Sequence, residues 1–270
     1  LFMTTATNGA QNNTIQNNTI TLSSAYQNAI GVFSTSSSSV TNGALAASSA
    51  LGTNSNNKVY NNTISNVNVG IYFICEPVTA TVLESGNDFG GSTSATGNRI
   101  TFGVLGTPGA FYTRFSNSIN GGIIYRNGAG FSARYNTITS NSLAYALSNG
   151  LNGIAVSSGT APAGAVVYTQ NFSNNKITLT TTGVALVYGI DFGHGTANAT
   201  MTGSNNNISI TQTSGAANSA AINGIRASYT SGTKTFDTDT LTVTQSNSAG
   251  ATSGLVIGIN AGTNAGTTVN

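Results

Sequence analysis

Short apolar-polar-apolar segments recur along the chain, each directly after an asparagine or an aspartate. In these segments the apolar residues stand at positions i and i+2, which lie on one face of a β-strand, while Thr or Ser occupies the other face. The pattern therefore predicts short strands with one buried face. The segments are "NNTITL" at Asn18, "NNTIS" at Asn62, "NRITF" at Asn98, "YNTIT" at Asn136, "NKITL" at Asn175, "NISIT" at Asn207 and "DTLTV" with Asp239 in the asparagine position.

A second strand pattern, glycine followed by apolar residues, alternates with the first. Each Asn segment is followed by one Gly segment before the next Asn segment begins, and the Asn segments are 32–44 residues apart. A period of this size with several short strands is typical of a solenoid. We expect the glycine to permit a corner before the second strand. The Gly segments begin at Gly31, Gly70, Gly122, Gly153, Gly189, Gly224 and Gly258.

Strands this short are not stable alone, but stacking equivalent strands from successive repeats buries a continuous core. The asparagine at each strand start tolerates a left-handed backbone and can bond locally. Stacked at the strand spacing, such amides can also form a ladder of hydrogen bonds. A helical period does not persist for ten residues anywhere, and Asn, Ser, Thr and Gly are poor helix formers. The sequence therefore predicts an all-β protein.

The recurring "NNTI…GI" pattern resembles the right-handed parallel β-helix, the architecture shared by pectate lyase-like enzymes and many bacterial surface proteins. The resemblance runs from about residue 12 to the end. It implies a right-handed parallel β-solenoid of about seven uneven coils, with residues 34–57 and 76–97 as projecting loops. We expect one solenoid domain over residues 1–270, as part of a longer chain. Because an uncapped parallel stack exposes strand edges, we expect neighbouring domains or subunits to cover its ends.

Composition and charge narrow the class of partner. Of the 270 residues, 142 are Asn, Ser, Thr or Gly and only 14 are charged, with a net charge of +2. That balance is too weak to indicate nucleic acid or an anionic membrane as partner, and no apolar run approaches the roughly 20 residues that cross a bilayer. Cys75 is the only cysteine, so it builds no disulfide framework. The scarcity of Lys and Glu suggests an extracellular or cell-surface protein.

Polysaccharide cleavage is the enzyme activity that the family resemblance implies. Glycosidic hydrolysis needs two carboxylates that flank the bond. Only Asp237 and Asp239 are close in sequence, and we interpret them as a turn and a strand start. Residues 100–185 contain no Asp or Glu. The acidic residues are Glu76, Glu84, Asp88, Asp191, Asp237 and Asp239.

His194, in "DFGHGT", resembles the Gly-His-Gly motif of polygalacturonase-like β-helix hydrolases. In that family an arginine one coil later binds substrate, and Arg226 lies 32 residues further on. The aspartate motifs expected one and two coils earlier are missing, so we predict that His194 and Arg226 are not catalytic and that the protein is not an enzyme. One His, one Cys and scattered acids cannot assemble a zinc site. We expect no metal and no cofactor.

The outward positions of the Asn segments predict two columns of hydroxyl groups, spaced about 4.8 Å from coil to coil and interrupted by Arg99 and Lys176. Threonine is common on half-exposed strands, so these columns do not by themselves indicate a binding surface. Alternatively, a regular face could bind a repetitive ligand such as a glycan or ice, and the columns resemble those of ice-binding solenoids. Aromatic residues at 109–115 could stack on sugar rings. The predicted hydroxyl residues are Thr19, Thr21, Thr63, Ser65, Thr101, Thr137, Thr139, Thr178, Ser209, Thr211, Thr240 and Thr242.

Taken together, these patterns favour a non-enzymatic extracellular β-solenoid that serves as a stalk, adhesin or surface-fibre module. Two alternatives stay open: a carbohydrate-active β-helix, either polysaccharide-binding or a degenerate pectinase-like protein, and an ice- or crystal-binding surface. The expected partners are glycans or other cell-surface proteins.

Overall fold

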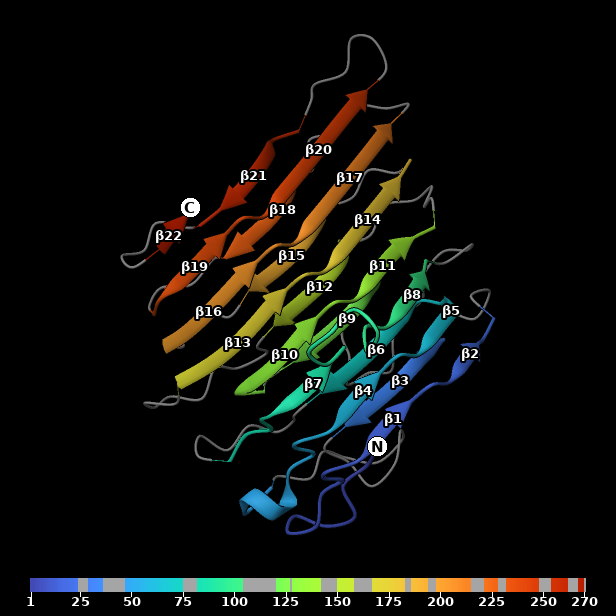
Figure 1. The fold of residues 1–270 in the computed structure, drawn as a ribbon, viewed down its shortest axis with the longest axis vertical. Coiled ribbons are helices and arrows are strands. Elements are labelled where there is room, and N and C mark those ends of the chain that lie inside the picture. Colours follow the sequence, from blue (N-terminus) through green and yellow to red (C-terminus); the bar gives the residue numbers. More distant parts are fainter. Residues whose placement is uncertain are drawn as a thin grey trace.

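The computed structural model is a parallel β-solenoid with three sheets (Figure 1). The chain visits the three sheets in turn, so each set of three consecutive strands adds one strand to each sheet. We call such a set a repeat. The structure describes residues 1–23, 29–35, 47–74, 82–103, 120–126, 128–141, 150–157, 167–182, 186–193, 198–214, 221–227, 232–247, 254–261 and 267–269.

Every strand pairs in parallel with its counterparts in the neighbouring repeats. The first sheet holds β1 (Thr14–Gln16), β4 (Lys58–Tyr60), β7 (Asn87–Phe89), β10 (Gly130–Arg134), β13 (Val167–Ser173), β16 (Asn198–Ser204), β19 (Lys234–Asp237) and β22 (Thr267–Val269). The second sheet holds β2 (Thr19–Thr21), β5 (Thr63–Val67), β8 (Arg99–Phe102), β11 (Thr137–Ser140), β14 (Lys176–Thr181), β17 (Asn207–Ser214) and β20 (Thr240–Asn247). The third sheet holds β3 (Ile30–Thr35), β6 (Val69–Ile74), β9 (Asn120–Arg126), β12 (Leu151–Ser157), β15 (Val187–Gly193), β18 (Ile222–Ala227) and β21 (Val256–Asn260).

The predicted strands are present, and the first sheet is an addition to them. The Asn segments form the second sheet and the Gly segments form the third, so the parallel solenoid architecture is confirmed. Residues 76–97 were expected to be a loop, and this is wrong for residues 87–89, which form β7 of the first sheet. Between β3 and β4 the described part, 47–57, carries a single 3-10 turn, Ala50–Gly52. No helix in the described ranges has the length or the apolar character to span a bilayer.

The corner between the first and second sheets uses two residues with separate roles. The strands β10 and β11, for example, are joined by Tyr135 and Asn136 alone. The first corner residue takes a left-handed backbone conformation, with φ of 59° at Tyr135, and the second starts the next strand. The double asparagine of "NNTI" is explained by this division, because asparagine tolerates the left-handed region better than most residues. The left-handed residues here are Asn17, Asn61, Tyr135, Asn174, Asn205 and Thr238.

The second corner residues form a continuous ladder of side-chain hydrogen bonds. The Oδ1 atom of Asn136 accepts from the backbone N–H of Asn98 at 3.2 Å and from Asn98 Nδ2 at 2.9 Å. Asn98 Nδ2 also donates to the Val59 carbonyl at 2.8 Å. The ladder residues are Asn18, Asn62, Asn98, Asn136, Asn175, Asn206 and Asp239. Asn207, which was expected in this position, instead pairs with Lys176 one place further along the strand.

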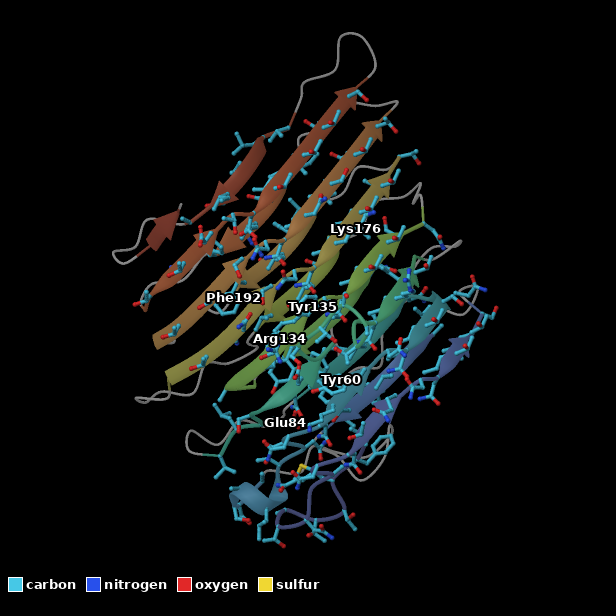
Figure 2. All side chains as sticks on the ribbon, in the orientation of Figure 1. Tyr60, Glu84, Arg134, Tyr135, Lys176 and Phe192 are labelled. Carbon is cyan, nitrogen blue, oxygen red and sulfur yellow. The ribbon has the colours of Figure 1, made fainter. Side chains whose placement is uncertain are left out.

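The core lies between the sheets, and the second sheet contributes a stack of isoleucines to it. Ile138 and Ile177 of the second sheet are adjacent in register and fully buried. Phe172 of the first sheet contacts Phe192 of the third edge to face, with ring centroids 5.9 Å apart. Figure 2 labels Phe192. This packing provides the continuous core that strands of three to eight residues require.

The glycines of the third sheet do not form corners, so that expectation is wrong. None of the seven has a positive φ, and each lies within a strand. A Cβ on Gly153 would lie 2.4 Å from the Gly189 carbonyl oxygen and 2.6 Å from Ile177 Cγ2. Glycine is therefore needed because the isoleucine of one repeat packs directly on the glycine backbone of the preceding repeat.

Candidate binding surfaces

The outward face of the second sheet carries the predicted hydroxyl residues, in a corrected register. Thr101, Thr139 and Thr178 pair in sequence, and Thr178 pairs with Ser209, which pairs with Thr242. Ser209 therefore belongs to the second column, and Thr211 belongs to a third, which begins at Thr180. The first column reads Thr19, Thr63, Arg99, Thr137, Lys176, Asn207 and Thr240. The second column pairs Thr21 with Ser65, is interrupted by a register shift between β5 and β8 after Ile64, and continues with Thr101, Thr139, Thr178, Ser209 and Thr242.

Hydroxyl groups form a two-dimensional patch where the strands of this sheet are longest. The strands β14, β17 and β20 continue past the second column and add further outward Thr and Ser residues. Strand geometry spaces them by about 4.8 Å between strands and about 6.6 Å along each strand. We call this the hydroxyl patch: Thr178, Thr180, Ser209, Thr211, Thr213, Thr242, Thr244 and Ser246, all exposed or half-buried. No charged side chain interrupts it.

A groove of about 450 Å³ lies on the outer side of the first sheet, at the start of β7 and β10 and beside the middle of β13. Gly86 and Gly130 contribute no side chains to it, which hollows the surface. The groove was not predicted, because the first sheet itself was not. Its lining residues are Ser85, Gly86, Asn87, Asp88, Ala129, Gly130, Phe131, Ser132, Thr169 and Asn171.

Asp88, the one carboxylate of the groove, is already engaged. Its Oδ2 atom accepts from Tyr60 Oη at 2.7 Å and from Arg134 Nη2 at 2.8 Å; Figure 2 labels both donors. Desolvation, together with the hydrogen bond to Asp88, raises the pKa of Tyr60 to about 12. No second carboxylate lines the groove, so the residues described there do not form the acid pair of a glycoside hydrolase.

Arg226 lies on the outer face of the third sheet beside Asp191, its partner in register. Its Nε and Nη2 atoms donate to the two carboxylate oxygens of Asp191, each at 2.6 Å. Its Nη1 atom donates to Tyr188 Oη at 3.1 Å, and its guanidinium carbon lies 4.1 Å from the Tyr188 ring centroid. Burial raises the pKa of Asp191, and the hydrogen bonds from Arg226 oppose that rise. The arginine is thus used to hold a carboxylate.

We expect Arg226→Ala to lower the free energy of unfolding by about 2–4 kcal/mol, because it leaves the Asp191 carboxylate buried without its bidentate donor. Denaturant unfolding at pH 7, followed by circular dichroism, measures the change. Arg99→Ala is the matched control: Arg99 is exposed on the second sheet, and its loss should cost less than about 0.5 kcal/mol. Equal losses in the two variants would show that the Asp191 pair is not structural.

Of the remaining candidate residues, Asp237, Asp239 and Glu84 lie in the described part of the chain. Asp237 ends β19 and Asp239 directly precedes β20, so the interpretation of this pair as a turn and a strand start is confirmed. Glu84 is buried. Among the described residues, no group of three or more His, Cys, Asp or Glu could hold a metal ion. Cys75, Glu76, His194 and the aromatic segment 109–115 lie outside the described residues.

Comparison of the chain with protein-family models, with curated proteins and with solved structures finds no match. The protein is therefore defined by its architecture, a parallel β-solenoid with three sheets and an asparagine ladder at one corner.

Proposed function

We propose that this chain is a non-enzymatic segment of an extracellular or cell-surface protein, in which it serves as a stalk, adhesin or surface-fibre module. The supporting observation is that three carboxylates are engaged in contacts within the solenoid. Asp88 is held by Arg134, Asp191 by Arg226, and Asp239 by the ladder residue Asn206. These three carboxylates thus serve structural contacts, while the ladder and the core run through successive repeats.

We further infer that the solenoid is right-handed and has about seven coils. Right-handed crossovers join parallel strands of one sheet in about 98% of known cases. The second and third sheets each contain seven strands in chain order, which supports the coil number. A continuous hydrogen-bonded stack of this kind resists extension along its axis, as a stalk or fibre segment requires.

Incubation with polygalacturonate, with and without calcium, tests the non-enzymatic part of the proposal. We expect no reducing ends and no unsaturated product. Product that disappears on His194→Ala would overturn it.

Brief protease treatment of intact source cells tests the location, because a surface segment should release peptides from this chain while the cells stay intact. Peptides that appear only after lysis would contradict a surface location.

The hydroxyl patch favours one second candidate, the binding of a repetitive ligand such as a glycan or ice. The test compares wild type, Thr211→Lys at the centre of the patch, and Thr235→Lys on the outer face of the first sheet, by glycan array and by thermal hysteresis. We expect all three proteins to be inactive, which leaves the patch as a strand surface. Activity that is lost only in folded Thr211→Lys would establish the patch as a binding surface.

A further inference from the structure

The ladder contains one residue that cannot make all of its hydrogen bonds when it is ionised. In each asparagine of the ladder interior, Oδ1 accepts two hydrogen bonds from the preceding repeat, and Nδ2 donates to a carbonyl of the first sheet. Asp239 reproduces the first half of this arrangement. Its Oδ1 atom accepts from the Asn206 backbone N–H at 2.7 Å and from Asn206 Nδ2 at 2.9 Å.

The second half of the arrangement is missing at Asp239. The carbonyls that accept from Nδ2 form one register column: Ile15, Val59, Phe89, Ala133 and Phe172. The next residue of this column is Gly203, because Phe172 pairs with Gly203. At the matching position Asp239 carries Oδ2, which is buried and has no hydrogen-bond partner. A Cβ on Gly203 would lie 3.5 Å from this oxygen, so the oxygen lies beside Gly203, the next residue of the column.

We propose that Asp239 is a pH-sensitive element. Protonation of its carboxyl group tightens the attachment of the β19–β21 repeat to the preceding repeat. A neutral carboxyl group carries a hydrogen on one oxygen, as the amide carries hydrogens on Nδ2. Protonated at Oδ2, Asp239 donates to the Gly203 carbonyl and completes the pattern of the other ladder residues. The ionised form instead places an acceptor against an acceptor, and a buried unsatisfied acceptor destabilises the fold.

Burial, and to a smaller extent the neighbouring charge of Asp237, favours the neutral form of Asp239. Burial raises its pKa, and the negative charge of Asp237 raises it further, against the opposing hydrogen bonds from Asn206. Of the charged groups on β16, β17, β19 and β20, Asp237 is the one that acts on this carboxyl. Lys234, at the other end of β19, is buried.

The sign of the pH dependence follows from this raised pKa. Protonation of Asp239 contributes stability that is fully present below the pKa of an unfolded aspartate, about 3.9. That stability is lost as the pH rises through the folded pKa. The β19–β21 repeat is therefore attached most firmly to the preceding repeat in acid, and this attachment weakens as the pH rises.

Asp239→Asn separates this element from every other titrating group, because the amide donates at all pH values. We expect the variant to melt about 2–4 °C above wild type at pH 7.5, and the difference to shrink toward zero at pH 4. Native-state hydrogen exchange should show higher protection of the Asn206 and Thr240 amides in the variant at pH 7.5, and equal protection in acid. Asp237→Asn is the control, and it should change the melting temperature at pH 7.5 by less than Asp239→Asn does.

Asn136→Asp provides an independent second test. It places the same carboxyl group in another repeat of the ladder, and we expect a loss of melting temperature at pH 7.5 that is partly recovered at pH 4. A difference between wild type and Asp239→Asn that does not change with pH would overturn the proposal. So would a variant that melts below wild type at pH 7.5.

Discussion

Asn136→Ala is expected to lower the free energy of unfolding by about 3–6 kcal/mol, because it removes four buried hydrogen bonds at once and leaves the Asn98 N–H and the Phe89 carbonyl without their side-chain partner. Asn136 is fully buried. Its Oδ1 atom serves both donors of Asn98, while its Nδ2 atom donates to Asn175 Oδ1 and to the Phe89 carbonyl. The alanine variant removes all four bonds and leaves each partner in a site that water does not reach. Equilibrium denaturation followed by far-ultraviolet circular dichroism measures the loss.

Asn207→Ala is the matched control for the ladder. Asn207 lies one place further along its strand than the ladder residue, and its side chain is exposed. We expect its loss to change stability by less than about 0.5 kcal/mol. If the two alanine variants were equally stable, the ladder would contribute no more than surface asparagines do.

Gly153→Ala is expected to cost about 3 kcal/mol or more, although it adds a single methyl group. The added Cβ would meet the Gly189 carbonyl oxygen at 2.4 Å, and a backbone atom within a sheet cannot move aside as a side-chain end can. Overpacking a well-packed core usually costs about 1–3 kcal/mol, and this site is more constrained. The shift in denaturation midpoint, measured with an unchanged spectrum at zero denaturant, gives the value.

The chain offers a control for this glycine within the same column. Gly258 occupies the equivalent position in β21, and among the described residues a Cβ there would meet only Leu241 Cδ1, at 3.8 Å. Gly258→Ala should therefore be close to neutral. A similar cost at both positions would point to backbone flexibility, and not close approach, as the reason for glycine in this sheet.

The second and third sheets could be predicted because their segments carry a fixed residue beside the apolar pattern. Every second-sheet strand follows a ladder residue, and every third-sheet strand contains a glycine on which an isoleucine or leucine packs. The one error of register, at Asn207, arose where three asparagines occur in a row. The hydrogen bond from Asn175 to Asn206 identifies the ladder residue among them, and so does the spacing of two residues between the ladder residue and the first buried Ile or Leu of its strand.

The first sheet could not be predicted with the same rule, because its inward positions vary. Val59, Phe89, Ala133, Phe172 and Gly203 share one register column but differ greatly in volume. Several of its strands are only three residues long. The groove was missed for the same reason, since it depends on which residues of β7, β10 and β13 become neighbours. The hydroxyl columns needed only the second-sheet pattern, so their residues were identified from the sequence.

The corner between the first and second sheets keeps two residues in every repeat but one, whereas the other connections range from the single residue Asn68 to the segment 36–57. In the exceptional repeat, residues 90–98 replace the two-residue corner, yet Asn98 still occupies the ladder. The alignment of successive strands is therefore maintained by amide pairing and not by connection length. A lineage of such proteins can vary its connecting segments freely on the other two corners and still add or delete whole repeats, as long as each new repeat brings its own asparagine.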